Sequence, residues 1–133
     1  IDGEEYNITC VSMGNPHCVV FIKGDIDNLE LDKIGPKFEN DKLFPERVNT
    51  EFVKVLDDHT IKMRVWERGS GETWACGTGA CAAAVAACEN GFCNKGDDST
   101  VKLKGGDLVI NYTDETVYMT GEAERVFEGT VEV

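Results

Sequence analysis

Residues 80–91 have the sequence Ala-Cys-Ala-Ala-Ala-Val-Ala-Ala-Cys-Glu-Asn-Gly, and this stretch decides the fold. Before Glu89 every residue is Ala, Cys or Val, and Asn90-Gly91 is typical of the left-handed end of a helix. A helix that is apolar on all sides has no face for solvent. We therefore predict a helix over residues 80–89 that is enclosed by the rest of the domain, with small side chains that let strands approach it closely.

The segments on both sides of this helix alternate between apolar and polar residues, as strands do. The expected strands are residues 8–11, 18–22, 48–56, 61–66, 101–103, 108–112, 117–120 and 125–133. Leu29, Ile34 and Phe38 suggest a short helix, which Gly35-Pro36 limits to a turn or two on either side. Residues 67–79 contain four glycines and are predicted to be a loop that opens the apolar helix. These elements favour an α+β fold with a curved, largely antiparallel, roll-like or barrel-like sheet wrapped around a buried central helix.

The composition is that of one domain, residues 1–133. A hydrophobic content of 41% is enough for one packed core, and no repeat, linker or low-complexity stretch divides the chain. Thirteen basic residues against 25 acidic residues give a net charge of -12, which repels nucleic acids and anionic membranes. No apolar run reaches the roughly 20 residues of a membrane-spanning helix, and the first residues have no signal-peptide pattern. We expect a soluble, cytoplasmic protein.

The chain has six cysteines, at positions 10, 18, 76, 81, 88 and 93. A disulfide framework is disfavoured because the core is large enough without it and four of the six lie in or beside the Ala-rich segment, where cysteine behaves as a small apolar residue. Zinc binding by the last four is also disfavoured, because zinc sites usually use short loop spacings. We expect no metal, interpret Cys81 and Cys88 as packing residues on one helix face, and leave Cys10, Cys18 and Cys93 unassigned.

Cys76 is different because it stands between glycines just before the predicted helix. Unpaired backbone N–H groups and the positive end of the helix dipole meet at such a position. They favour a thiolate at Cys76, and the N–H groups of Gly77 and Thr78 could also hold a substrate carboxylate. A thiolate beside a bound carboxylate supports either attack on a carbonyl or removal of the α-proton, and the residues alone favour neither.

A cysteine-protease mechanism would need a histidine base, and the chain has two histidines. His59 follows Asp57-Asp58 in an expected hairpin turn and is interpreted as a solvated turn residue. His17 lies in a Gly-Asn-Pro-His turn and could approach Cys76, but the spacing does not show that it does.

Three blocks of the sequence resemble the signature blocks of the diaminopimelate epimerase family. They are Met13-Gly14-Asn15-Pro16-His17, Val48-Asn49-Thr50-Glu51-Phe52-Val53, and Glu67-Arg68-Gly69 continuing to Cys76-Gly77-Thr78-Gly79-Ala80-Cys81. They occur in the family's order and at compatible separations, and Met119-Thr120-Gly121-Glu122-Ala123 is similar to the family's end. The resemblance covers essentially the whole chain, which corresponds to the carboxy-terminal half of the family.

The resemblance implies an enzyme, a cofactor-independent isomerase that interconverts LL- and meso-diaminopimelate in lysine and peptidoglycan-precursor biosynthesis. In that family one thiolate removes the α-proton while a thiol on the opposite face delivers another, and the site lies between two similar halves. Cys76 corresponds to the catalytic cysteine of the second half, and His17 and Glu67 correspond to residues that tune the thiols. The positions that match the family's substrate-binding residues are Asn15, Asn49, Glu67, Arg68, Gly77 and Thr78.

The first half of the family's pattern, with the other cysteine, is missing from this sequence. The resemblance therefore implies an excised domain or a naturally shortened protein that is inactive without an N-terminal half as its partner. The oligomeric state is not predicted, and a homodimer stays open. Two alternatives also stay open: a proline racemase-like isomerase of the same fold, and a non-catalytic binding or assembly domain. In the second, Asn15 and Asn49 would be ordinary turn residues and Glu67-Arg68 a surface ion pair.

Overall fold

The computed structural model of the chain describes residues 6–73, 77–113, 116–121 and 130–131. Two helices, a 3-10 turn and nine strands form within them. In chain order the elements are β1 (Ile8–Ser12), β2 (Pro16–Phe21), η1 (Ile26–Asn28), α1 (Leu31–Glu39), β3 (Asn49–Asp57), β4 (Thr60–Glu67), β5 (Gly71–Thr73), α2 (Gly77–Glu89), β6 (Asp98–Leu103), β7 (Gly106–Tyr112), β8 (Val117–Gly121) and β9 (Thr130–Val131).

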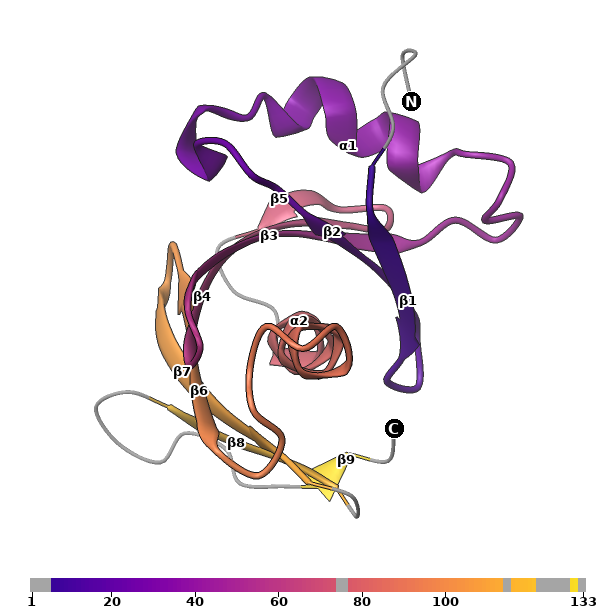
Figure 1. Cartoon of the computed structure of the whole chain (residues 1–133). Coiled ribbons are helices and arrows are strands. Elements are labelled where there is room, and N and C mark those ends of the chain that lie inside the picture. Colours follow the sequence, from indigo (N-terminus) through magenta and orange to yellow (C-terminus); the bar gives the residue numbers. More distant parts are fainter. Residues whose placement is uncertain (1–5, 74–76, 114–115, 122–129, 132–133) are drawn as a thin grey trace.

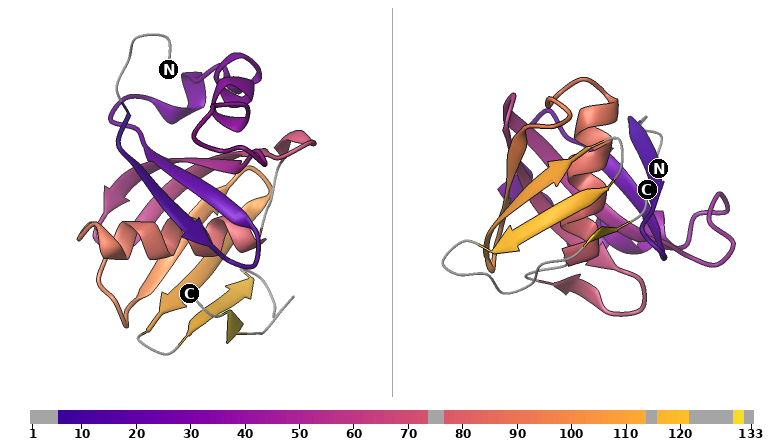
Figure 2. Two further views of the ribbon diagram at one scale, coloured as in Figure 1. Left: turned by 90° about the vertical axis from the view of Figure 1, so that its right-hand side faces the viewer. Right: turned by 90° about the horizontal axis from the view of Figure 1, so that it is seen from below.

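The strands form one curled sheet around α2. Along the sheet the order is β1-β2-β3-β4-β6-β7-β8-β9, and β5 pairs with β4 outside this path. The β2–β3 and β4–β6 pairs are parallel, and the other pairs are antiparallel. Figure 1 looks down α2 and shows the sheet curving around it as an incomplete barrel, while Figure 2 shows α2 lying along the inside of the sheet. The predicted fold class is therefore confirmed.

Helix α2 is enclosed, as its composition predicts. Residues 80–87 are at most 3% exposed and share one core with the inward-facing residues of β4, Ile61, Met63 and Val65. The helix begins at Gly77, three residues earlier than expected, and ends at Glu89 as expected. Gly91 follows with a positive φ of 78°, which ends the helix.

A second core lies between the outer face of the sheet and α1, which packs outside the sheet (Figure 1). Alternation along the strands supplies both cores: Val19 and Val53 face α2, whereas Val20 and Phe52 face α1. This is why β2 and the first half of β3 are buried on both faces.

The short helix expected around Gly35-Pro36 is present as α1, which has nine residues and about one turn on either side of this pair. Pro36 lies inside the helix. Gly35 allows close packing, because a Cβ at this position would lie 2.3 Å from Cδ2 of Trp66. A single proline in one short helix removes one backbone hydrogen bond, and packing of the buried face against the sheet offsets that loss.

The expectation that residues 67–79 form only a loop is wrong, since β5 lies within it and pairs with β4. Gly69 and Gly71 have φ values of 79° and 82°, which let the chain reverse tightly after β4. Residues 74–76 lie outside the described residues, as do most of the positions expected to form the last strand, of which only Thr130–Val131 is described and is a strand.

Candidate active site

Four polar residues share the inner face of the sheet where β2 and β3 begin and β4 ends. His17 on β2 is the register partner of Asn49 on β3, and Glu51 lies two residues further along β3 on the same face. Thr50 pairs with Trp66, so the next position in the register sets Asn49 beside Glu67 of β4. Strand β2 and the β3–β4 hairpin, which are separated by α1 in sequence, therefore bring these side chains together.

His17 and Glu51 form a fully buried pair. The Nδ1 atom of His17 lies 3.0 Å from each carboxyl oxygen of Glu51, and both side chains are 0% exposed. On the other side of the ring, Nε2 lies 3.1 Å from Oδ1 of the half-buried Asn15. The site therefore contains an uninterrupted chain of hydrogen-bonded groups from the core to its surface.

Burial makes both members of this pair resist ionisation. It lowers the pKa of His17 to about 4, and the positive charge of Arg68 acts in the same direction. Burial also raises the pKa of Glu51 well above its ordinary value, with a further contribution from the negative charge of Glu67. At neutral pH we therefore take His17 as a neutral imidazole and Glu51 as a neutral carboxylic acid.

Asn49 holds two backbone segments together. Its Nδ2 donates to the carbonyl of Pro16 over 3.1 Å, and its Oδ1 accepts from the backbone N–H of Arg68 over 2.8 Å. Asn49 is thus the first residue of β3 and not a turn residue, although its side chain satisfies backbone groups as that interpretation expects. The amide still has one N–H and one oxygen lone pair beyond these two bonds.

Arg68 and Glu67 stand where the chain leaves β4, and both are half-buried. The Arg68 guanidinium donates to the backbone carbonyl of Glu46 over 3.3 Å. In the described part of the chain Arg68 forms no ion pair with Glu67, so the interpretation of these residues as a surface ion pair is not what the structure contains.

Glu39, which is not predicted from the sequence, anchors the same loop. This carboxylate is 6% exposed. One oxygen accepts from the Trp66 indole N–H over 2.9 Å, and the other accepts from the Gly69 backbone N–H over 3.0 Å and from Arg47 over 3.1 Å. It fixes the path of the chain on both sides of Glu67-Arg68.

Glu51 was quoted within a sequence block but not singled out as a site residue. The signal was present, because Glu51 is a lone carboxylate in the run Thr50-Glu51-Phe52-Val53 at an inward position two residues from Asn49. A carboxylate buried in such a strand needs a partner.

Cys76 lies outside the described residues, and its neighbours Gly77 and Thr78 form the first turn of α2. Thr73, the last residue of β5, pairs with Val65, two residues before Glu67. Four residue steps from Thr73 to Gly77 span at most about 14 Å. The start of α2 is thus within reach of the end of β4, although this bound does not put Gly77 and Thr78 in contact with the buried pair.

The other five cysteines are free thiols. Cys81 is buried in the α2 core as expected, whereas Cys88 is only half-buried. Burial raises the pKa of Cys18 to about 12 and that of Cys88 to about 11, so both remain protonated at neutral pH.

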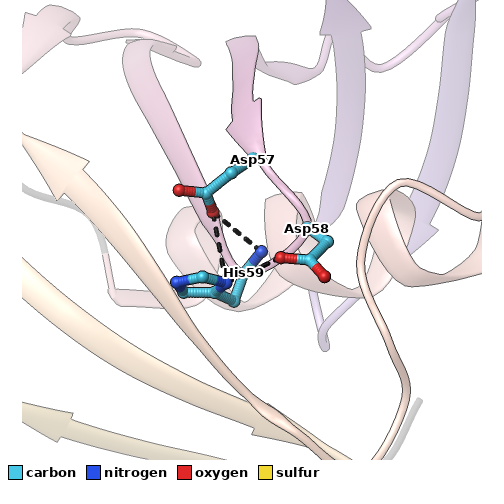
Figure 3. Close-up of side chains that lie close together, drawn as sticks. All are labelled: Asp57, Asp58 and His59. Atoms are coloured by element: carbon cyan, nitrogen blue, oxygen red, sulfur yellow. Dashed lines mark hydrogen bonds and ion pairs between the residues drawn. The ribbon is translucent and has the colours of Figure 1, made fainter.

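A separate polar cluster, Asp57, Asp58 and His59, occupies the β3–β4 hairpin turn (Figure 3). Asp57 accepts from the backbone N–H of His59 over 2.9 Å, and Nδ1 of His59 lies 2.7 Å from Asp58. All three are exposed, and the hydrogen bond to Asp58 raises the pKa of His59. His59 is thus the solvated turn residue that the sequence predicts, and the cluster is explained by the turn itself.

The fold places this chain in a class of α+β proteins with a curled sheet. Two solved structures share this fold over part of their length. One is a PhzF-family phenazine biosynthesis protein of Bacillus anthracis, with a TM-score of 0.56 and 25% identity over 86% of this chain and 37% of that one. The other is a putative phenazine biosynthesis PhzC/PhzF protein of Clostridium difficile, with a TM-score of 0.63 and 19% identity over 86% of this chain and 42% of that one.

Within this class the chain belongs to the diaminopimelate epimerase family, whose model matches residues 9–126. It is 57% identical to a diaminopimelate epimerase of Acetivibrio thermocellus over 100% of this chain and 47% of that protein. It is 56% identical to that of Desulfovibrio desulfuricans, over 97% of this chain and 45% of that protein. The chain therefore spans about half the length of these relatives. In the described part of the chain, no helix is long and apolar enough to cross a membrane.

Proposed function

We propose that this chain supplies one half of a cofactor-independent epimerase that interconverts LL- and meso-diaminopimelate, with Cys76 as one of its two acid–base thiols. The observation that carries the proposal is identity of 57% over the whole chain to a diaminopimelate epimerase, together with the polar residues that β2, β3 and β4 bring together. The reaction belongs to lysine and peptidoglycan-precursor biosynthesis, which is a cytoplasmic process.

The position of Cys76 in the sequence suits an acid–base thiol. It directly precedes α2, whose first N–H groups have no partner within the helix. Those donors and the helix dipole favour a thiolate, and they also favour a substrate carboxylate on Gly77 and Thr78. One helix end would therefore both lower the pKa of the base and hold the acid group next to the proton to be removed.

The α-proton of an amino acid is weakly acidic, so the site must stabilise the negative charge that develops when it leaves. Arg68 can pair with a carboxylate, and the amides of Asn15 and Asn49 can donate to it. Glu67 and His17 would tune the thiols. His17 acts in this scheme as a neutral group, because burial keeps its pKa low.

Inversion at carbon requires a second acid–base group on the opposite face of the substrate. We assign this group, and the rest of the pocket, to the N-terminal half that the relatives have and this chain lacks. The chain is then inactive alone. The amino-acid racemase alternative shares this two-base logic and differs only in how the distal part of the substrate is recognised.

The test uses the full-length protein that contains this chain, incubated with LL-diaminopimelate in deuterated water. General acid–base groups contribute about 10²- to 10⁴-fold, so we expect Cys76→Ala to reduce both formation of the meso isomer and deuterium uptake by that factor. Cys10→Ala is the matched control, because Cys10 is an exposed free thiol outside the site, and it should change the rate less than about twofold.

An active Cys76→Ala variant would contradict the assignment of the base. Faster racemisation of proline than of diaminopimelate would favour the racemase alternative. Tight substrate binding without any exchange in the unmodified protein would favour a binding domain.

A further inference from the structure

Hydrogen bonds link Glu51 to His17 and His17 to Asn15. Both carboxyl oxygens of Glu51 lie 3.0 Å from Nδ1, and Oδ1 of Asn15 lies 3.1 Å from Nε2. The His17–Glu51 contact and the His17–Asn15 contact each need one proton, and a single proton serves both oxygens of Glu51. The positions of those protons decide which way the Asn15 amide faces.

The proton on the Asn15 side follows from the chemistry of the amide. A carbonyl oxygen only accepts, so the contact with Asn15 Oδ1 requires an N–H at Nε2 of His17. The ring therefore presents a donor to Asn15 in this structure.

The proton on the Glu51 side can be on Nδ1, giving an imidazolium and a carboxylate, or on the carboxyl group, giving two neutral groups. Both side chains are 0% exposed, and ionising two groups without water carries a large desolvation penalty. The charges around the pair act in the same direction: Arg68 disfavours a positive His17, and Glu67 disfavours a negative Glu51. The neutral arrangement is therefore favoured, with Glu51 donating to Nδ1.

We propose that Glu51 is a positioning residue of the site: as a buried carboxylic acid it donates to Nδ1, fixes His17 as the neutral Nε2–H tautomer, and thereby turns the Asn15 amide so that its N–H groups face the substrate. The proposal rests on the proposed function and extends it, because it gives Asn15 a defined task. Asn15 becomes a donor to an anionic group of the substrate, the carboxylate.

The surroundings of Asn15 agree with this task. Its side chain is half-buried and, among the described residues, its amide N–H groups donate to no other residue. Oδ1 of Asn15 accepts from the Nε2–H of His17. If the amide rotated by half a turn, its NH2 group would face this N–H, and two donors would meet. The orientation is thus maintained by a residue that does not itself touch the substrate.

The first experiment reads the tautomer directly. In the full chain labelled with ¹⁵N at its two histidines, His17 is assigned by loss of the other signal in His59→Gln. We expect a protonated-type resonance at Nε2 and an unprotonated-type resonance at Nδ1 at neutral pH. In Glu51→Gln the tautomer should persist, because the glutamine amide can still donate to Nδ1. A proton on Nδ1 with none on Nε2, or protons on both nitrogens at neutral pH, would overturn the proposal.

The second experiment measures the effect on substrate in the full-length enzyme. Glu51→Leu removes the donor to Nδ1, so we expect KM for diaminopimelate to rise about tenfold or more, with a smaller change in kcat, and Glu51→Gln to restore most of the loss. Equal KM values for the two variants would contradict the positioning role. The tautomer measurement needs no activity, and its only variant is His59→Gln at an exposed turn position, so the tautomer can be confirmed even where the epimerase assignment fails.

Discussion

At the scale of single residues, Gly35 packs its backbone directly against the ring of Trp66 on β4. Replacing a helical glycine with alanine usually stabilises a protein by up to about 1 kcal/mol. Here the new Cβ would lie 2.3 Å from Cδ2 of Trp66, whose indole is held by Glu39. Since the ring cannot move away freely, we expect Gly35→Ala to destabilise the fold by about 1–3 kcal/mol, the usual range for overpacking.

Urea unfolding measures this difference, and Gly24→Ala is the matched control. A Cβ at Gly24 meets no atom within 4 Å, and its φ is outside the left-handed region. Equal stability of the two variants would mean that α1 can shift away from Trp66.

The buried pair of His17 and Glu51 predicts an unusual pH profile of stability. In the unfolded chain these groups titrate near their ordinary pKa values of 6.5 and 4.5, whereas in the folded chain burial lowers the pKa of His17 to about 4 and raises that of Glu51 well above 4.5. Between pH 4.5 and pH 6.5 the folded and the unfolded states each hold one proton on the pair. The pair therefore gives the free energy of unfolding no pH dependence in this range. Above pH 6.5 only the folded state retains this proton. Below pH 4.5 the unfolded state holds one proton more than the folded state.

The free energy of unfolding should therefore be highest between about pH 4.5 and pH 6.5 and fall on either side, by up to about 1.4 kcal/mol per pH unit. Glu51→Gln has no proton to retain, so its stability should not show the alkaline loss due to this pair, while the loss on acidification begins near 6.5. Urea unfolding at about pH 6 and about pH 8 for both proteins tests the sign. A wild-type protein no more sensitive to alkali than Glu51→Gln would contradict the raised pKa of Glu51.

Sequence and structure agree on the site to different degrees for different residues. The structure brings together Asn15, His17, Asn49 and the end of β4, which were selected through a resemblance and not through spacing. The contribution of Glu39 could not be predicted, because its three partners come from segments 8 to 30 residues away in sequence. Contacts of this kind depend on how α1 docks, which local patterns do not determine.

At the scale of elements, the burial of α2 was predicted correctly because residues 80–88 are all Ala, Cys or Val, so no rotation of this stretch gives it a polar face. The prediction for α1, a short helix with a turn or two on either side of Gly35-Pro36, was also correct. Glycine and proline disfavour a helix interior, and only the tertiary contact with Trp66 explains why glycine is present within this one.

The enclosed position of α2 predicts that it cannot accept a charge. Ala83 and Ala84 are 0% and 1% exposed. Changing either to Glu buries a carboxylate without a partner, which costs several kcal/mol and is comparable to the stability of a small domain. We expect Ala83→Glu and Ala84→Glu to unfold the domain or to abolish its cooperative melting by circular dichroism.

Leu43→Glu is the control, because it introduces the same side chain at a position that is 69% exposed. It should melt within about 0.5 kcal/mol of the unmodified chain. Cooperative melting of an α2 variant near the unmodified temperature would mean that the helix can expose this side.

At the scale of the whole molecule, the local patterns predicted most strands but not their order. The antiparallel neighbours β3–β4 and β6–β7 are hairpins that turn signals reveal. The parallel pairs β2–β3 and β4–β6 join strands separated by α1 and by α2. Parallel strands are not joined by a hairpin turn, so no turn signal in the sequence predicts that they pair. The β2–β3 pair, which sets His17 beside Asn49, could therefore not be predicted.

At this scale the chain is predicted to fold alone but to need the other half of the protein for activity. It has its own enclosed helix and two hydrophobic cores, so we expect it to fold without the remainder of the longer relatives. In the proposed function it contributes one acid–base thiol, and inversion needs another group on the opposite face of the substrate, so we expect that the chain alone does not form meso-diaminopimelate from the LL isomer. Adding the separately produced N-terminal half should restore turnover, and the same half added to Cys76→Ala should not. Epimerisation by the 133-residue chain alone, unaffected by Cys76→Ala, would contradict the two-half mechanism, because the proposed mechanism gives this chain one acid–base thiol and needs a second acid–base group on the opposite face of the substrate.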